Sequence, residues 1–148
     1  MKPTETVDYH IKFLWHSISN LYNQIAQEFG LTQATGYALL NIDSKEGIAA
    51  TKIAPLMGMK ATSLSRMLKK MESDNLIFKK KCKDDGRSVK IHLTEKGQEK
   101  KKIARKVVRE FNQYMLERID QRELKQYFET MCSIKEITEE YKILKLNQ

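Results

Sequence analysis

Hydroxyl and cationic side chains alternate with apolar ones along residues 60–74, at a spacing that sorts the two kinds onto opposite faces of one helix. The apolar face consists of Leu64, Met67, Leu68 and Met71. The polar face consists of Lys60, Thr62, Ser63, Ser65, Arg66, Lys69 and Lys70. Hydroxyl groups bond to base edges or phosphates, and an arginine can contact guanine through two hydrogen bonds. The pattern indicates a helix that reads the major groove of DNA, although an ordinary amphipathic helix gives the same spacing.

The positive charge of the chain is concentrated around this segment. The 148 residues include 27 Lys and Arg against 19 Asp and Glu, a net charge of +8. Residues 60–106 alone hold sixteen basic and six acidic residues, so the rest of the chain is slightly acidic. A local positive field is expected at a site that binds a polyanion, because Lys and Arg neutralise phosphates and release counterions.

The elements around residues 60–74 have the order of a winged helix-turn-helix. A short helix is predicted at Thr51–Met57, and Gly58 provides the tight turn before the second helix. After Asn75 the apolar period changes from about 3.6 to 2, which predicts strands at residues 76–81 and 89–93 joined by a polar loop. The resulting hairpin is basic and carries Lys79, Lys80, Lys81, Lys83, Arg87 and Lys90. Such a wing lies along the DNA backbone or enters the minor groove.

Two motifs in and after the wing make the resemblance specific. Asp85-x-Arg87 followed by Leu93-Thr94-x-x-Gly97, in this order of elements, resembles the MarR family of bacterial regulators over nearly the whole chain. The resemblance implies that Arg87 enters the minor groove and that Asp85 orients it through a salt bridge. Lys81 and Lys83, which belong to the same basic wing, are also predicted to contact DNA. Lys60 departs from the family, which often has Ser or Thr as the cap of the reading helix.

We expect a single chain of mainly α structure with a small β-hairpin wing (α+β). Its parts are an N-terminal dimerisation helix at 6–29, a winged helix-turn-helix DNA-binding region at 32–93 and C-terminal dimerisation helices at 94–146. The first and last helices carry long apolar stripes that favour a two-fold homodimer on a pseudo-palindromic operator, with half-sites roughly 34 to 36 Å apart. A helical hairpin that folds onto its own chain would use the same stripes.

The predicted function is that of a sequence-specific transcriptional regulator of double-stranded DNA, with repression as the default. We expect no enzyme activity and no cofactor, because the sequence has no Gly-rich phosphate loop, G-x-S-x-G or H-E-x-x-H motif. No metal site is expected, since His10 and His16 are six residues apart.

With no apolar run of membrane length and no signal sequence, we expect a cytoplasmic location and no membrane partner. The alternatives are a winged helix that binds nucleic acid without sequence preference, or one that only makes protein contacts.

Two further sites are weaker predictions. The resemblance implies that a small aromatic or acidic ligand releases the DNA, and its pocket would be lined by Tyr9, His10, Trp15, His16, Tyr22 and Tyr37. We favour the alternative that these residues belong to the core or an interface. Cys82 lies among lysines, which lower the pKa of a thiol, so a redox-responsive regulator is a second alternative. An incidental wing residue is the favoured interpretation.

Overall fold

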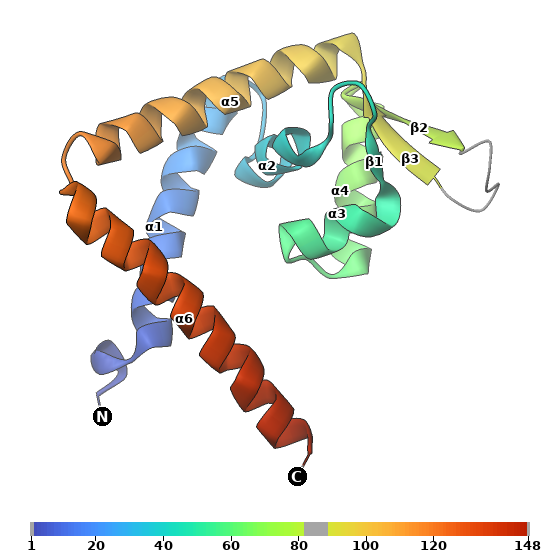
Figure 1. Ribbon diagram of the computed structural model, residues 1–148. Coiled ribbons are helices and arrows are strands. Elements are labelled where there is room, and N and C mark those ends of the chain that lie inside the picture. The colour runs from blue at the N-terminus through green and yellow to red at the C-terminus, as the bar shows by residue number, and fades with distance from the viewer. Residues whose placement is uncertain (1, 82–88, 148) are drawn as a thin grey trace. The chain divides into compact units, whose positions relative to one another are not determined.

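The computed structural model describes residues 2–81 and 89–147, and these form two units, one up to Val107 and one from Val108 onward. The first unit begins with a 3₁₀ turn, η1 (Pro3–Glu5), and ends within α5 (Glu95–Leu116), whose last residues belong to the second unit together with α6 (Gln121–Leu146). The other elements of the first unit (Figure 1) are α1 (Val7–Glu28), α2 (Gln33–Asn41), β1 (Ile48–Ala49), α3 (Ala50–Met57), α4 (Ala61–Ser73), β2 (Ile77–Lys81) and β3 (Val89–Leu93).

The helices begin and end where the local sequence predicts. The Thr32 side chain caps α2 by accepting a hydrogen bond from the Thr35 N–H at 3.1 Å, and Asp120 caps α6 in the same way through the Arg122 N–H at 2.8 Å. Gly58 ends α3 with φ +60°, and Asn75 follows α4 with φ +59°, a left-handed conformation that asparagine tolerates. The predicted helices are confirmed within a few residues, and the predicted fold class is confirmed.

The wing strands belong to a three-stranded antiparallel sheet of order β1-β3-β2. In β2 and β3, Ile77 lies opposite Leu93 and Lys81 opposite Val89, as the predicted hairpin requires. The prediction of two strands was incomplete, because Ile48 and Ala49 pair with the other edge of β3. Two residues are too few to show a strand period, so only the pairing partner reveals β1.

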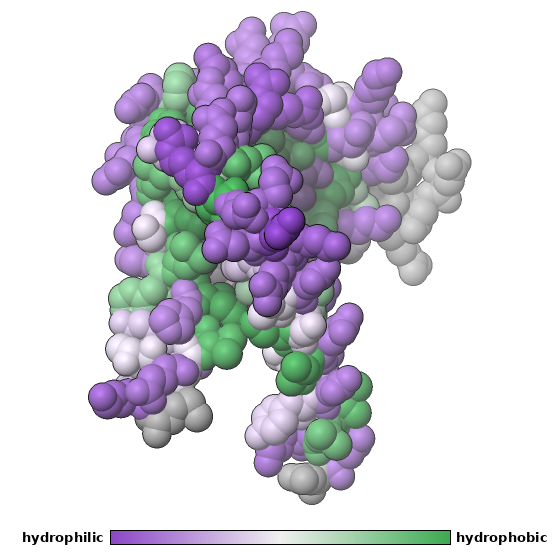
Figure 2. Space-filling view, turned by 60° about the vertical axis from the view of Figure 1, so that its left-hand side comes forward, coloured by the Kyte–Doolittle hydropathy of each residue, from purple (hydrophilic) through white to green (hydrophobic). Residues whose placement is uncertain are grey.

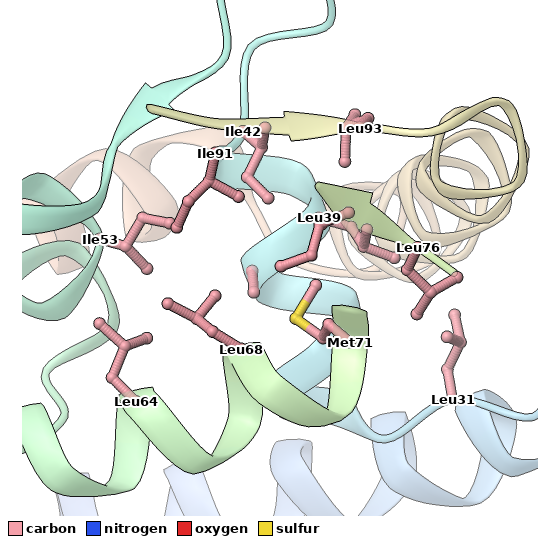
Figure 3. Packing of buried hydrophobic residues seen from close by; sticks show 12 residues of the cluster. Leu31, Leu39, Ile42, Ile53, Leu64, Leu68, Met71, Leu76, Ile91 and Leu93 are labelled. Carbon is pink, nitrogen blue, oxygen red and sulfur yellow. The ribbon is translucent and has the colours of Figure 1, made fainter. Parts of the chain in front are cut away.

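One hydrophobic core holds the first unit together (Figure 3). It joins α2, α3, α4 and the sheet through twelve buried residues: Leu31, Ala38, Leu39, Ile42, Ile53, Leu64, Leu68, Met71, Leu76, Ile77, Ile91 and Leu93. Figure 3 shows the side chains of α4 directed toward those of α2, α3 and the sheet. The core therefore fixes the rotation of α4 about its own axis, and with it the direction of the opposite face.

Candidate nucleic-acid interface

The polar face of α4 is the candidate interface, and the structure places all of it at the surface. Leu64, Leu68 and Met71 are buried and Met67 packs against the core, as the spacing predicts. The predicted DNA-contacting residues of this segment are all exposed: Lys60, Thr62, Ser63, Ser65, Arg66, Lys69 and Lys70. A helix held by its apolar face on a close-packed core is a rigid support for these side chains.

The N-terminal end of α4 has the features of a phosphate contact. Lys60 occupies the N-cap position without a side-chain capping hydrogen bond. The first N–H groups of a helix have no acceptor within the helix, and the helix dipole makes this end positive. Because the cap is a lysine rather than Ser or Thr, an anion approaching the first turn meets backbone donors, the hydroxyls of Thr62 and Ser63 and the Lys60 ammonium together.

Lysines at the other end of α4 and in the wing make ion pairs within the chain. Lys70 Nζ lies 2.7 Å from Asp74 Oδ1, and Lys79 Nζ lies 2.7 Å from Glu72 Oε2. Both pairs are well exposed, so each contributes little stability and its lysine remains accessible to a phosphate. The Lys79 pair also ties the base of the wing to α4.

Part of the predicted wing site lies outside the described residues. Lys81 is exposed at the end of β2. The predicted contacts at Lys83, Asp85 and Arg87 and the candidate thiol of Cys82 fall within residues 82–88, which the structure does not describe. Their roles stay predictions.

The Leu93-Thr94-x-x-Gly97 motif has a structural explanation. The Thr94 hydroxyl accepts a hydrogen bond from the Gly97 N–H at 3.0 Å and donates one to the Asn75 carbonyl at 2.6 Å. A Cβ atom on Gly97 would lie 2.0 Å from the Leu76 carbonyl oxygen, a contact that no side chain can make. The motif thus caps α5 and fastens it to the residues that follow α4, so it positions α4.

Three lysines of the basic segment stabilise the fold, a role that the sequence analysis did not foresee. Lys96 Nζ donates to the Asp74 carbonyl, Lys100 Nζ to the Phe29 carbonyl and Lys101 Nζ to the Ile42 carbonyl. These acceptors are the C-cap residues of α4, α1 and α2, at the negative ends of the helix dipoles. The basic segment between residues 60 and 106 therefore also has a structural role and is not one uniform DNA-facing surface.

Lys101 is the buried member of this set. Burial lowers its pKa from the ordinary value of 10.5, and the nearby Arg105 lowers it further, while Asp43 acts in the opposite direction. Asp43 has a lowered pKa of its own, because its carboxylate accepts hydrogen bonds from the backbone N–H groups of Glu46 and Lys45. Asp43 and the Lys101 ammonium group both lie at the C-terminal end of α2. Neither residue belongs to the polar face of α4.

The residues predicted to line a ligand pocket lie on α1 and α2. Tyr9 packs against His10 and Phe13, with ring centroids 5.5 and 4.3 Å apart. Trp15 and Tyr37 are exposed, as are His10 and His16, whereas Tyr22 is partly buried. A pocket does occur in the first unit, but it lies at the α1–α2 turn and is lined by none of these residues. Their ligand role stays a prediction.

Comparison with known proteins places the chain in a family. The sequence profile of the MarR family matches residues 31–89. The SarZ transcriptional regulator of Staphylococcus saprophyticus is 30% identical over 132 residues, which cover 83% of this chain and 90% of SarZ. The chain belongs to the MarR family. The SarZ of Staphylococcus epidermidis is 31% identical over 96 residues, 62% of this chain, and that alignment spans only 64% of the relative.

Solved structures of MarR-type proteins share the whole architecture. A MarR family regulator from Listeria monocytogenes, solved with a 26mer DNA, superposes with a TM-score of 0.79 at 23% identity, and the match covers 92% of this chain and 89% of that one. At this identity the likeness establishes the fold. It confirms the predicted winged helix-turn-helix fold class, while the contacts of individual residues depend on this chain's own geometry.

Proposed function

We propose that this chain is a homodimeric regulator of transcription that binds double-stranded DNA in a sequence-specific manner, with α4 in the major groove and the wing against the backbone or minor groove. The observation that carries the proposal is the exposed polar face of α4, which combines hydroxyls and cations on a helix whose other face is locked into the core. The DNA in the Listeria structure supports the assignment, because that protein shares this fold.

The chemistry of this face favours sequence reading over charge attraction alone. Arg66 has the planar donor group that recognises guanine, and Ser65 beside it can donate to or accept from a base edge. Lys69 and Lys70 follow one turn later and have the chemistry of phosphate contacts. We therefore assign discrimination between sequences to Ser65 and Arg66, and affinity to the phosphate contacts at both ends of α4 and in the wing.

Large apolar side chains on α1 and α6 support the homodimer. In the first half of α1, and in α6, bulky hydrophobic residues are exposed in the single chain. They are Val7, Ile11, Phe13, Leu14, Trp15, Tyr127, Phe128, Ile137, Tyr141, Ile143, Leu144 and Leu146. Figure 2 shows green, hydrophobic surface on the lobe at the lower right, next to the grey atoms of the C-terminal residue. Soluble monomers rarely expose this many large apolar side chains, and a second copy of the chain would bury those of each helix symmetrically. A two-fold dimer implies a pseudo-palindromic operator, and we propose repression as the sign of regulation.

Selection of bound sequences from a random DNA pool tests the function. We expect an enriched motif with two-fold symmetry and half-sites about one helical turn apart. Arg66→Ala should lower the affinity for the selected site by about 1 to 3 kcal/mol and relax the preference at one base pair in each half-site. Lys102→Ala, which removes one charge from exposed α5 surface, is the matched control. Absence of any enriched motif, with binding that random competitor DNA abolishes, would support the alternative of a non-specific nucleic-acid-binding protein.

The oligomeric state is tested separately. Ile137→Asp places a charge in the middle of the proposed α6 interface, so sedimentation equilibrium should show a shift from dimer to monomer. Gln126→Asp adds the same charge at an exposed polar position of the same helix and should leave the dimer intact. Equal behaviour of the two variants would contradict the proposed interface.

A further inference from the structure

A pocket of about 470 Å³ lies beside the C-terminal end of α4, within the first unit. Its wall is formed by three segments that are distant in sequence: residues 29–35 at the α1–α2 turn, residues 70–76 at the exit of α4, and the first turns of α5. Pockets of a few hundred cubic ångströms are the size of small-molecule sites in proteins. None of the residues predicted to bind a ligand on α1 and α2 lines this pocket.

The charge of the lining is strongly positive. Lys70, Lys96 and Lys100 line the pocket, and Asp74 is the acidic residue that lines it with them. Lys70 and Asp74 form an ion pair at 2.7 Å, so their charges cancel. The remaining net charge of +2 is carried by the ammonium groups of Lys96 and Lys100. Such a wall is complementary to an anion with two negative charges.

Two of these ammonium groups are held in place by the backbone. Lys96 Nζ donates to the Asp74 carbonyl at 2.9 Å, and Lys100 Nζ donates to the Phe29 carbonyl at 2.6 Å. An ammonium group has three donors, so each lysine is positioned by one hydrogen bond and keeps donors for a ligand. Fixing the cations before binding lowers the entropy cost of capturing an anion.

The N-terminal turn of α2 contributes side chains rather than backbone donors. The N–H groups of Gln33 and Thr35 are already bonded, to Asn23 Oδ1 at 2.8 Å and to Thr32 Oγ1 at 3.1 Å. Thr32 and Thr35, whose hydroxyl oxygens are 2.9 Å apart, line the pocket. An anion held here would therefore contact lysines and hydroxyls, with Leu31 and Leu76 supplying apolar wall for the remainder of the molecule.

We propose that this pocket binds the phosphate monoester of a small metabolite. At neutral pH a phosphate monoester carries nearly two negative charges and three strong acceptor oxygens, which match the two net positive charges and the ammonium donors. A monocarboxylate would leave one cation of the lining without compensation. The hydroxyl pair and the apolar wall suit a phosphorylated compound with a small organic body better than the free ion.

Occupancy of the pocket would act on the reading helix, a consequence that rests on the proposed DNA-binding function. Lys70 and Asp74 form the last turn and cap of α4, so a dianion competes with Asp74 for Lys70 and neutralises part of the positive charge beside the DNA. We expect a saturating phosphate monoester to weaken operator binding roughly 5-fold to 100-fold, the usual range of coupling between two sites.

The site itself is tested without DNA. Glucose 6-phosphate is titrated into the full-length, ¹⁵N-labelled protein at constant ionic strength, with inorganic phosphate and benzoate titrated in parallel. We expect saturable shifts of the Gly30 and Thr35 amide signals with glucose 6-phosphate. Lys100→Gln and Lys70→Gln should each weaken binding about tenfold, because each removes one charged hydrogen bond. Lys102→Gln, equal in charge but outside the pocket, should bind within about twofold of the parent protein.

The outcomes separate the parts of the proposal. Shifts that never saturate, or an equal effect of the Lys70, Lys100 and Lys102 variants, would overturn the pocket. Benzoate binding as tight as that of glucose 6-phosphate would overturn the phosphate assignment. Saturable binding that leaves operator affinity unchanged in fluorescence anisotropy would overturn the coupling alone. If no operator is found, the proposed function fails while the titration still decides the pocket. Lys70→Gln perturbs only an exposed ion pair, so it keeps the test informative should Lys100→Gln fold poorly.

Discussion

The helices α4 and α6 both carry large apolar side chains, but these lie in different surroundings. Leu68 in α4 is 6% exposed, whereas Leu144 in α6 is 63% exposed, and this contrast holds along both helices. α4 finds its partners within the first unit, in α2, α3 and the sheet. Among the described residues of the second unit, to which α6 belongs, none is buried. α4 therefore has one apolar face that is buried when the chain folds, whereas the apolar side chains of α6 stay exposed and are available for assembly.

Truncation of one leucine in each helix gives the largest expected effect. Leu68→Ala should lower the free energy of unfolding by about 2 to 5 kcal/mol at every protein concentration, because it opens a cavity in a closed core. Leu144→Ala should change it by less than about 0.5 kcal/mol at concentrations where the chain is monomeric. Chemical denaturation over a range of protein concentrations measures both. A large, concentration-independent cost for Leu144→Ala would mean that α6 is packed within its own chain.

Two glycines of the first unit differ in the space around them in a similar way: Gly97 is tightly enclosed, whereas Gly36 is not. Gly97→Ala should destabilise the protein by about 3 kcal/mol, since the new methyl group meets the Leu76 carbonyl oxygen at the junction of α4 and α5. Gly36→Ala, within α2, meets only the Ala104 methyl group at 3.8 Å and should stabilise the protein by roughly 0.5 to 1 kcal/mol. Thermal unfolding of the two variants checks the sign of each effect. The two changes in the free energy of unfolding should have opposite signs. Destabilisation by Gly36→Ala would show that α2 packs more tightly against its neighbours than the 3.8 Å contact implies.

The lysine contacts of α5 should have smaller effects. Lys101→Met leaves the Ile42 carbonyl without its ammonium donor and should cost about 1 to 3 kcal/mol, whereas Lys102→Met, on exposed surface, should be nearly neutral. The cost should also depend on pH. Because burial lowers the pKa of Lys101, the unfolded chain holds this proton more tightly, and the stability of the parent protein should rise relative to Lys101→Met as the pH increases toward 10.5. Denaturation curves at several alkaline pH values measure this difference.

The smallest expected effect lies in the turn after α2. The two backbone N–H groups bonded to Asp43 hold its pKa below the ordinary 3.8, so its contribution to stability is present above pH 3.8 and is lost as the pH falls through the folded value. A ¹³C NMR titration of the carboxyl carbon should give this lowered pKa in the folded protein. A midpoint at or above 3.8 would show that the turn does not persist in solution.

The candidate site was predictable to the extent that it depends on one helix. The alternation between Leu64, Leu68 and Met71 and the polar residues around Arg66 fixes which side chains point away from the core, and the structure agrees. The prediction treated residues 60–106 as one basic surface and missed that some of its lysines stabilise the fold. Lys96, Lys100 and Lys101 bind the carbonyl ends of three helices, two of which precede them by about 60 to 70 residues. Nothing in their own neighbourhood reveals those partners.

The sequence alone determined the helices, the two main wing strands and the caps, because each depends on residues within a few positions of one another. It also determined the resemblance that the family comparison confirmed. Only the tertiary structure decided that a third strand completes the sheet, that Gly97 must lack a side chain, and that a positive pocket forms at the exit of α4. Each of these joins segments far apart in the chain, and such contacts arise from packing rather than from local preference.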